Sequence, residues 1–401
     1  MTPPLPLVPR VPRLRALIIT HNYPRFDSDP VGSFVHRLAV SLTGQGIDVR
    51  VIAPAAPNVP AEDTFDGIHV TRFRYAPRDM ETLAYSGTMG AQVRGSWKAK
   101  LAMAGFLAQG FRAASRELAA FPADVLHAHW WFPGGLLARA VRARTGLPYV
   151  VTMHGSDVRL AATVPGGAAL FRRVSRNAAA LTTVSRWLAS EAGKMDTQAR
   201  PIVAPMPVVP DLFSPGGTRD ANRILFVGKI TEQKGLHHLL RALPLMKHAA
   251  TVDVVGAGRV DDTEIRRLAH ELGVAHRINW LPLVSQRALS DLYRSAALHV
   301  IPAVHEGLGL TAVESLLCET PVVAFDSGGL PDIVLPEKTG LLVPVGDIRA
   351  LATALDRVLG DAALRARMGR EGRQFALAQF GPDAAAARYA GILLSAARSH
   401  S

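Results

Sequence analysis

The chain of 401 residues has a single cysteine, Cys318, few aromatic residues (6%) and no uninterrupted apolar run of membrane-spanning length. One cysteine excludes a disulfide framework, which favours a reducing cytoplasm. A bilayer-spanning helix needs about 18 consecutive apolar residues. The longest candidate, residues 101–111, is closed by Lys100 and Arg112. RNP motifs, zinc-ligand spacing and heptad-linked basic regions are also missing, which disfavours nucleic acid as a partner.

The composition is that of a globular enzyme with two domains. Apolar residues make up 48% and charged residues 19% of the chain, which is ordinary for an α/β enzyme. A length of 401 residues favours two domains over one. Lysine and arginine exceed aspartate and glutamate by 12. This excess favours anionic partners such as phosphorylated small molecules or an acidic membrane face.

Short apolar segments alternate with longer helical patterns, which predicts α/β domains with parallel sheets and crossover helices. Strands are expected at residues 16–20, 49–53, 125–129, 149–153, 180–184, 223–227, 252–255, 278–281, 298–301, 322–325 and 340–343. Between the two series lies a passage with five prolines in residues 201–215, a density that opposes regular structure and is typical of a linker.

These patterns divide the chain into five parts. We expect a loose tail (1–13), a first doubly wound domain (14–200), a linker (201–216), a second doubly wound domain (217–380) and a C-terminal helix (381–401). Two such domains place a cleft between the carboxyl ends of their sheets, where ligands bind.

The most specific motif is the segment His-Glu-Gly-Leu-Gly-Leu-Thr-Ala-Val-Glu-Ser at residues 305–315, which puts Glu306 and Glu314 eight apart around a glycine-rich turn. The turn follows an expected strand and opens a helical stretch at 310–317. A helix start with free amide groups and a positive dipole end favours a phosphate. Carboxylates on either side suit sugar and ribose hydroxyls, so the motif predicts a nucleotide-sugar site.

A second glycine turn carries two cations. Gly228 and Lys229 follow the expected strand at 223–227, and Lys234 comes before the next helix. Two converging ammonium groups can stabilise a diphosphate when it is bound and when it leaves. An exposed basic turn is the alternative. The position upstream of Glu306 favours the diphosphate site.

Histidines lie at two strand ends of the first domain. His154 and a following glycine end the strand expected at 149–153, at the edge where a cleft should open. His154 could donate a hydrogen bond to the transferred group or carry a proton, or it could be satisfied within its own loop. His127 and His129 indicate strand packing, because no third ligand at metal-binding spacing follows them.

Three further glycine turns are less specific. Gly32 and the next residue start the first expected helix, where their amides could meet a phosphate or an acceptor. The turn at 255–258 has only part of a dinucleotide fingerprint, because Asp261 stands where a glycine is needed, and we expect it to line the nucleotide pocket instead. The paired glycines Gly328 and Gly329 fit either backbone contact with a sugar or a compact turn.

A basic amphipathic stretch admits two interpretations. Apolar residues recur at helical spacing between residues 97 and 111, beside several lysines and arginines: Trp97, Leu101, Ala104, Ala108 and Phe111, with Arg94, Lys98, Lys100 and Arg112. The favoured interpretation is a helix whose apolar face meets the core. The alternative is a peripheral contact with a membrane surface.

Taken together, these motifs resemble the retaining glycosyltransferase family 4 (glycosyl transferases group 1), and the likeness extends from about His21 to Tyr389. The resemblance rests on the Glu-x7-Glu signature, the basic pair Lys229 and Lys234, the turn at His154 and the Gly-Gly-Pro-acidic turn that ends at Asp332. It implies the GT-B fold, in which two Rossmann-like domains face each other across a cleft and the C-terminal helix returns to the first domain.

The resemblance also implies roles for residues. Glu306 would face the donor sugar, Glu314 the ribose, and His154 the transferred sugar, while Lys229 and Lys234 hold the diphosphate. The backbone at Gly32 and Gly228 would approach the donor, Leu283 in the stretch 281–284 would border the base, and the remaining donor contacts would come from Gly307, Leu308, Gly309, Leu310 and Thr311. No metal and no cofactor is expected. The first loop has one glycine where members often have two, and Asp332 replaces a more frequent glutamate.

The expected activity is therefore transfer of a hexosyl-type sugar from a UDP- or GDP-sugar, with retention, to a hydroxyl acceptor. That acceptor would be a sugar, a lipid-linked molecule or a small molecule in cell-envelope polysaccharide, glycolipid or natural-product synthesis. The expected location is the cytoplasm, with the inner membrane face as an option. Two rivals stay open: a sugar-nucleotide epimerase or hydrolase, which would need further cleft acids, and a non-catalytic sugar-nucleotide-binding subunit.

Overall fold

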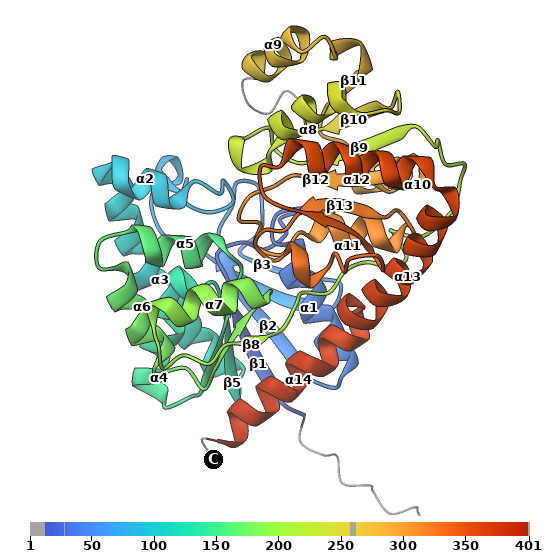
Figure 1. The fold of residues 1–401 in the computed structure, drawn as a ribbon. Coiled ribbons are helices and arrows are strands. Elements are labelled where there is room, and N and C mark those ends of the chain that lie inside the picture. Colours follow the sequence, from blue (N-terminus) through green and yellow to red (C-terminus); the bar gives the residue numbers. More distant parts are fainter. Residues whose placement is uncertain (1–12, 28, 257–261, 400–401) are drawn as a thin grey trace, which may run out of the picture.

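Two predominantly parallel sheets, one in each half of the chain, organise the molecule (Figure 1). The computed structural model describes residues 13–27, 29–256 and 262–399. In these ranges, an eight-stranded sheet has the order β3-β4-β2-β1-β5-β6-β7-β8, and a six-stranded sheet has the order β11-β10-β9-β12-β13-β14. Neighbouring strands run parallel except for the antiparallel pair β3 and β4. Two α/β sheet domains were predicted, and this part of the prediction is confirmed.

The strands of the first sheet are β1 (Arg15–Ile19), β2 (Asp48–Pro54), β3 (Glu62–Phe65), β4 (Ile68–Phe73), β5 (Val125–His129), β6 (Tyr149–Met153), β7 (Ala180–Thr183) and β8 (Ile202–Val203). Those of the second sheet are β9 (Arg223–Val227), β10 (Thr251–Val255), β11 (Ile278–Leu281), β12 (Leu298–Ile301), β13 (Val322–Phe325) and β14 (Gly340–Val343). The inner strands β5, β6, β12 and β13 are buried along their whole length. Mainly apolar runs predict them because parallel strands are covered on both faces.

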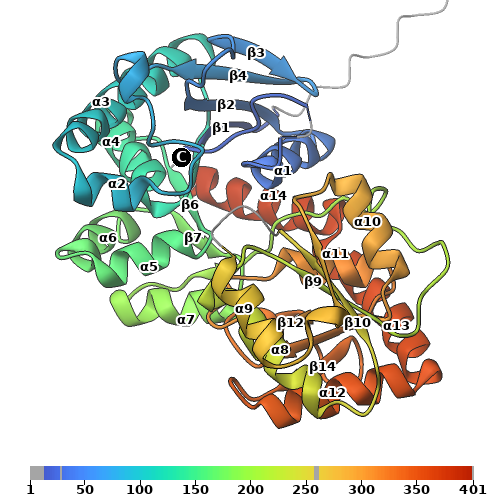
Figure 2. The same ribbon diagram turned by 90° about the horizontal axis from the view of Figure 1, so that it is seen from above.

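Helices cover both sheets. In the first half they are α1 (Ser33–Gly44), α2 (Met89–Gly95), α3 (Trp97–Ala120), α4 (Leu136–Thr145), α5 (Ser156–Thr163), α6 (Gly167–Ser175) and α7 (Arg186–Met195). In the second half they are α8 (Leu236–Ala242), α9 (Thr263–Glu271), α10 (Gln286–Ser295), α11 (Leu310–Leu317), α12 (Ile348–Gly360), α13 (Ala362–Phe380) and α14 (Pro382–Arg398). Figure 2 shows α3 and α4 on one side of the first sheet and α1 and α14 on the other.

The last helix crosses back to the first domain, as the resemblance implied. In both views α14 runs from the second domain and lies along α1 (Figures 1 and 2). The buried Tyr389 of α14 donates a hydrogen bond of 2.7 Å from its hydroxyl to the carbonyl of Ala204, and its ring lies 5.5 Å from that of His127. The helix therefore completes the covering of the first sheet.

Three features differ from, or lie beyond, the expectations. The hairpin of β3 and β4 was not predicted, although Asp66 and Gly67 form its turn with φ of 47° and 77°. The passage 201–216 begins with the short strand β8, which pairs with β7. Of the expected tail, residues 1–12 lie outside the described ranges, as do residues 257–261 of the expected turn at 255–258.

The apolar stripe of α3 faces solvent, which contradicts the favoured interpretation. Trp97 is 70% exposed and Leu101 59% exposed, while the core-facing side of the helix carries Ala102, Met103 and Phe106. The buried face lies elsewhere because glycine lets the helix approach its neighbours there: a Cβ on Gly105 would lie 2.2 Å from the carbonyl oxygen of Tyr75. Within the described ranges, no helix has the length and apolar character needed to cross a bilayer.

Candidate active site

The turn between β12 and α11 presents the start of a helix at the edge of the second sheet. Gly309 has φ of 95°, a left-handed conformation that favours glycine. A Cβ there would lie 2.8 Å from Cδ2 of Leu330. No side chain caps the helix, so the first amides of α11 point out of its end without a capping acceptor. This end is electropositive and suits an anion.

The paired glycines after β13 hold this turn in place. A Cβ on Gly328 would lie 2.1 Å from the carbonyl oxygen of Glu306, and one on Gly329 would lie 2.5 Å from that of Gly307. The amide of Gly329 also donates to the carbonyl of Glu306 at 2.8 Å. Of the two interpretations left open by the sequence, the compact turn is the one observed, because only glycine permits backbone packing this close.

Of the two predicted lysines, Lys234 lies in contact with the predicted carboxylate of Glu306. Nζ of Lys234 donates to Oε2 of Glu306 at 2.5 Å, and both side chains are largely buried. Gly228 lies beside this pair, since a Cβ on it would be 3.6 Å from Cδ of Lys234. Lys229 is exposed on the same loop. The ammonium group of Lys234 and the carboxylate of Glu306, which could bind hydroxyls, therefore lie together beside the start of α11.

Glu314 lies one turn inside α11 in a buried environment. Burial raises its pKa to about 7, while the charge of Arg37 and a hydrogen bond of 3.3 Å from the hydroxyl of Tyr293 act in the opposite direction. Arg37 belongs to α1 of the first domain and also donates to the carbonyl of Pro207 at 3.3 Å. Arg37 was not predicted, because nothing in a helix pattern indicates which basic residue will face another domain.

The His154 turn of the first domain lies directly against the Glu306 turn of the second. A Cβ on Gly307 would lie 3.1 Å from the carbonyl oxygen of His154. The carboxylate of Asp157 holds the His154 turn by accepting from the amides of His154, Gly155 and Trp131 at 3.0–3.1 Å. His154 and Glu306, far apart in sequence, thus come from the facing edges of the two sheets.

A buried layer of aromatic rings supports His154. Its Nε2 lies 3.0 Å from Nδ1 of His129, and the rings of Trp130 and Phe34 lie 4.5 and 5.0 Å from its own. Burial lowers the pKa of His154 to about 3, so its imidazole is neutral near pH 7. His127 bonds instead with Thr152 at 2.8 Å. In the described part of the chain, no group of three or more potential ligands is arranged to hold a metal ion.

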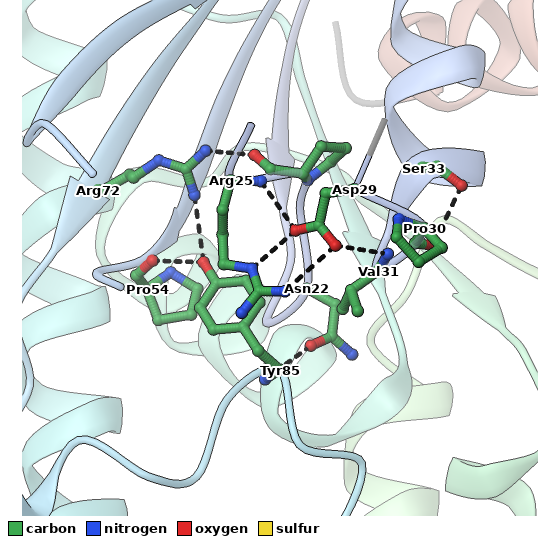
Figure 3. Close-up of polar contacts among 10 residues, drawn as sticks. Asn22, Arg25, Asp29, Pro30, Val31, Ser33, Pro54, Arg72 and Tyr85 are labelled. Carbon is green, nitrogen blue, oxygen red and sulfur yellow. Dashed lines mark hydrogen bonds and ion pairs between the residues drawn. The ribbon is translucent and has the colours of Figure 1, made fainter. Parts of the chain in front are cut away.

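The loop before α1 is folded around Asp29 (Figure 3). This carboxylate accepts from Nε of Arg25 at 2.7 Å and from the amides of Arg25 and Val31 at 3.1 Å. Gly32, with φ of 75°, then starts the helix, and a Cβ on it would lie 2.5 Å from the carbonyl oxygen of Asn22. Packing of the loop is enough to require this glycine, so its predicted contact with the donor stays a prediction.

The same loop is tied to the rest of the first domain by a buried arginine (Figure 3). Arg72 donates to the carbonyl of Pro24 at 2.5 Å and to the hydroxyl of Tyr85 at 3.2 Å. Tyr85 in turn donates to the carbonyl of Pro54 at 2.6 Å. These bonds fix the loop within the first domain.

At the predicted base site, Leu283 is 58% exposed in the loop after β11. The amide of Gly256 donates to the carbonyl of Leu281 at 3.1 Å, so the end of β10 lies beside this loop. Three consecutive residues that join the domains next to the site were not predicted from the sequence. Ser185 Oγ donates to the carbonyl of Gly307 at 2.6 Å, Arg186 binds the carboxylate of Asp332 through its amide and Nε at 2.6 and 2.7 Å, and Trp187 stacks on His305.

Comparison with known protein families gives the decisive observation. Residues 211–375 match the model described as glycosyl transferases group 1, and residues 31–205 match the glycosyl transferase 4-like domain. A D-inositol 3-phosphate glycosyltransferase of Xylanimonas cellulosilytica is 30% identical over 94% of this chain and 95% of its own length. The chain belongs to the group 1 glycosyltransferases. Three other curated relatives match over shorter stretches, which span 38%, 64% and 66% of their own lengths.

Solved structures agree on the fold of this glycosyltransferase. Sucrose-phosphate synthase from Thermosynechococcus elongatus superposes with a TM-score of 0.79 at 22% identity, covering 97% of this chain and all of that one. Anabaena HepE in complex with UDP and glucose gives a TM-score of 0.70 at 16% identity over 96% of this chain and all of that one. The predicted GT-B architecture is confirmed.

Proposed function

We propose that this glycosyltransferase moves a sugar from a nucleoside diphosphate to a hydroxyl acceptor with retention of anomeric configuration. The observation that carries the proposal is the meeting of Lys234, Glu306 and the open start of α11 with the His154 turn. In this arrangement the helix start and the two lysines, Lys229 and Lys234, bind the diphosphate. Glu306 binds hydroxyls of the sugar, and Glu314 binds those of the ribose.

The chemistry of the facing wall supports the proposal of retention, because it disfavours a double displacement. The His154 turn offers a neutral imidazole, and its own carboxylate, Asp157, is buried and accepts from three backbone amides. A carboxylate occupied in this way is a poor nucleophile for a double displacement. We therefore place attack and departure on the same face of the sugar.

In the proposed step, the bond from the anomeric carbon to the diphosphate oxygen breaks as the acceptor oxygen bonds to that carbon. The proton of the acceptor hydroxyl passes to the departing diphosphate. Lys234 and the amides of α11 stabilise the negative charge that develops on the leaving group. His154, neutral because it is buried, hydrogen-bonds the transferred sugar and holds its orientation.

UDP is the proposed nucleotide, because the similar fold of HepE was crystallised with UDP. Thermal-shift titration with UDP-, GDP- and ADP-glucose tests this, since a ligand that binds only the native state raises the melting temperature. We expect the largest shift with UDP-glucose and an α-linked product by NMR. Binding confined to GDP- or ADP-glucose would reject UDP, and a β-linked product would reject retention.

We further propose that the acceptor lies at or near a membrane surface. Trp97 and Leu101 project from α3 beside Lys98 and Lys100, all exposed. Exposed apolar residues ringed by cations are typical of helices that lie in the interface of anionic bilayers. The neighbouring helix α2 packs on α5 of the His154 turn, since a Cβ on Gly90 would lie 3.5 Å from Cδ1 of Leu160.

A further inference from the structure

A cavity of about 900 Å³ lies between the two domains, beside the proposed donor site. Helices α5 and α7 form its wall in the first domain, and α8 with the turn after β12 forms its wall in the second. Gly155 and His305 line it, and they are the chain neighbours of His154 and Glu306. A molecule held in this cavity would therefore reach the point where the two predicted sugar-binding turns touch.

The cavity contains an aromatic platform made by both domains. The indole of Trp187 and the imidazole of His305 are stacked with centroids 5.8 Å apart and planes only 8° from parallel. Val158 and Met195 add apolar surface to the same lining. Sugar rings present a C–H face that packs on flat aromatic surfaces, and such sites combine an apolar wall with a few polar groups.

The charges of the lining balance. Two basic residues, Arg159 and Lys194, face two acidic ones, Glu191 and Glu232, among the described residues that form it. Nζ of Lys194 donates to Oε1 of Glu191 at 2.5 Å, and Arg159 donates to the side-chain oxygen of Gln233 at 3.3 Å. Phosphate sites usually gather several uncompensated cations. This lining therefore suits an uncharged ligand better than a phosphorylated one.

A histidine in the lining adds no charge to it. Burial lowers the pKa of His238 to about 4, so its ring is neutral near pH 7. Its Nδ1 is buried and has no hydrogen-bond partner in the described part of the chain. That atom is closed off from the cavity, so the contribution of His238 to the lining is the surface of a neutral ring.

We infer that this cavity binds the acceptor, and that the acceptor presents an uncharged glycosyl group to the Trp187 platform. The inference rests on the proposed function, because it places the attacking hydroxyl next to the sugar held by His154 and Glu306. It adds the chemical class of the acceptor: a neutral glycoside is preferred over a sugar phosphate.

The test measures UDP release from UDP-glucose in water alone, with neutral p-nitrophenyl glycosides, and with glucose 6-phosphate. We expect a neutral glycoside to accelerate release more than glucose 6-phosphate does. Trp187→Ala should raise the KM for that glycoside at least tenfold while changing hydrolysis in water far less, and Trp187→Phe should retain most of the affinity. The matched control Phe375→Ala removes another half-buried ring, on α13, and should change neither value.

The outcomes separate the two proposals. If UDP-glucose gives neither a thermal shift nor hydrolysis, the proposed donor fails. If it is bound and hydrolysed but no neutral glycoside accelerates release, or glucose 6-phosphate is preferred, the acceptor inference alone is wrong. An unchanged KM in Trp187→Ala also overturns it. Should that variant not fold, Glu232→Lys provides the second test, because added positive charge should shift preference toward glucose 6-phosphate, and no shift would contradict the inference.

Discussion

Nδ1 of His129 lies 3.0 Å from Nε2 of His154, and the two rings are stacked 18° from parallel in the buried end of the first sheet. His129 therefore fixes the orientation of His154 without reaching the cleft itself. Loss of a neutral hydrogen bond costs about 1 kcal/mol, so we expect His129→Ala to lower kcat roughly fivefold to tenfold with a smaller change in donor KM. His127→Ala, two residues away on the same strand, is the control, and equal loss in both variants would mean a general packing effect.

Glu306→Gln should lower kcat by about 10- to 100-fold, because a hydrogen bond to a charged group is worth about 1.5–3 kcal/mol. We expect the native fold to persist, because Lys234, which loses its charged partner, is partly exposed to solvent. Steady-state kinetics and circular dichroism measure the two effects. Glu337→Gln, which disturbs only an exposed pair with Arg357, serves as the comparison. A folded Glu306→Gln variant with normal turnover would remove this residue from the mechanism.

Lys234→Ala should weaken UDP binding about tenfold or more, because it removes a charge-assisted contact to the diphosphate. Lys229→Ala should have a smaller effect, since that side chain is exposed and the interaction is screened by solvent. Calorimetric titration of UDP into each variant gives the Kd. Lys338→Ala, an exposed lysine after β13, is the matched substitution. Identical affinity for UDP in Lys234→Ala and the native protein would contradict the basic-pair assignment.

Stability should fall as the pH drops from 6.5 toward 5. Burial lowers the pKa of four histidines to about 3: His21, His127, His154 and His299. Below pH 6.5 the unfolded chain takes up these protons and the native state does not, so each histidine costs up to about 1.4 kcal/mol per pH unit. Glu314 acts in the opposite direction between about pH 4.5 and 7, because its pKa is raised to about 7. Denaturant unfolding at several pH values measures the net slope, which should be shallower in His127→Asn. The same slope in that variant and the native protein would contradict a neutral, buried His127.

Replacing both Trp97 and Leu101 by serine should reduce binding to anionic vesicles at least tenfold, because each removes apolar surface from the exposed face of α3. Flotation with phosphatidylglycerol–phosphatidylcholine vesicles measures this binding. Leu245→Ser, which alters a similarly exposed leucine (52%) on the second domain, is the control. Equal flotation of the double variant and the native protein would reject α3 as the lipid contact.

The second domain was largely predictable from local patterns. Strands β9, β11, β12, β13 and β14 and helix α11 have the predicted bounds, because each strand is a short, mainly apolar segment between turn residues. The hairpin β3–β4 escaped prediction because β3 is short and polar at the sheet edge. Its Asp66-Gly67 turn is a strong hairpin signal that would have found it.

Tertiary relationships could not be predicted in the same way. The approach of Arg37 to Glu314, and the contacts of Ser185, Arg186 and Trp187 with the second domain, depend on how two separate sheets face each other. For α3, periodicity identified an apolar stripe but not its direction, because alanine and glycine can line a closely packed face as well as larger residues do. Spacing alone indicates which residues share one face of a helix. Whether that face packs on the core or meets solvent depends on residues elsewhere in the chain.

Helix α14 makes the two halves of this enzyme structurally interdependent. The polypeptide passes between them once before β9 and again at Gly381, and its final seventeen-residue helix packs chiefly against α1, β5 and β6 of the first domain. Cleavage of the chain in the linker before β9 would thus leave the amino-terminal fragment with an uncovered apolar surface. The carboxyl-terminal fragment would carry α14 without the domain on which it packs. Any rocking of one half against the other must bend two tethers together, which confines that motion to a narrow set of directions.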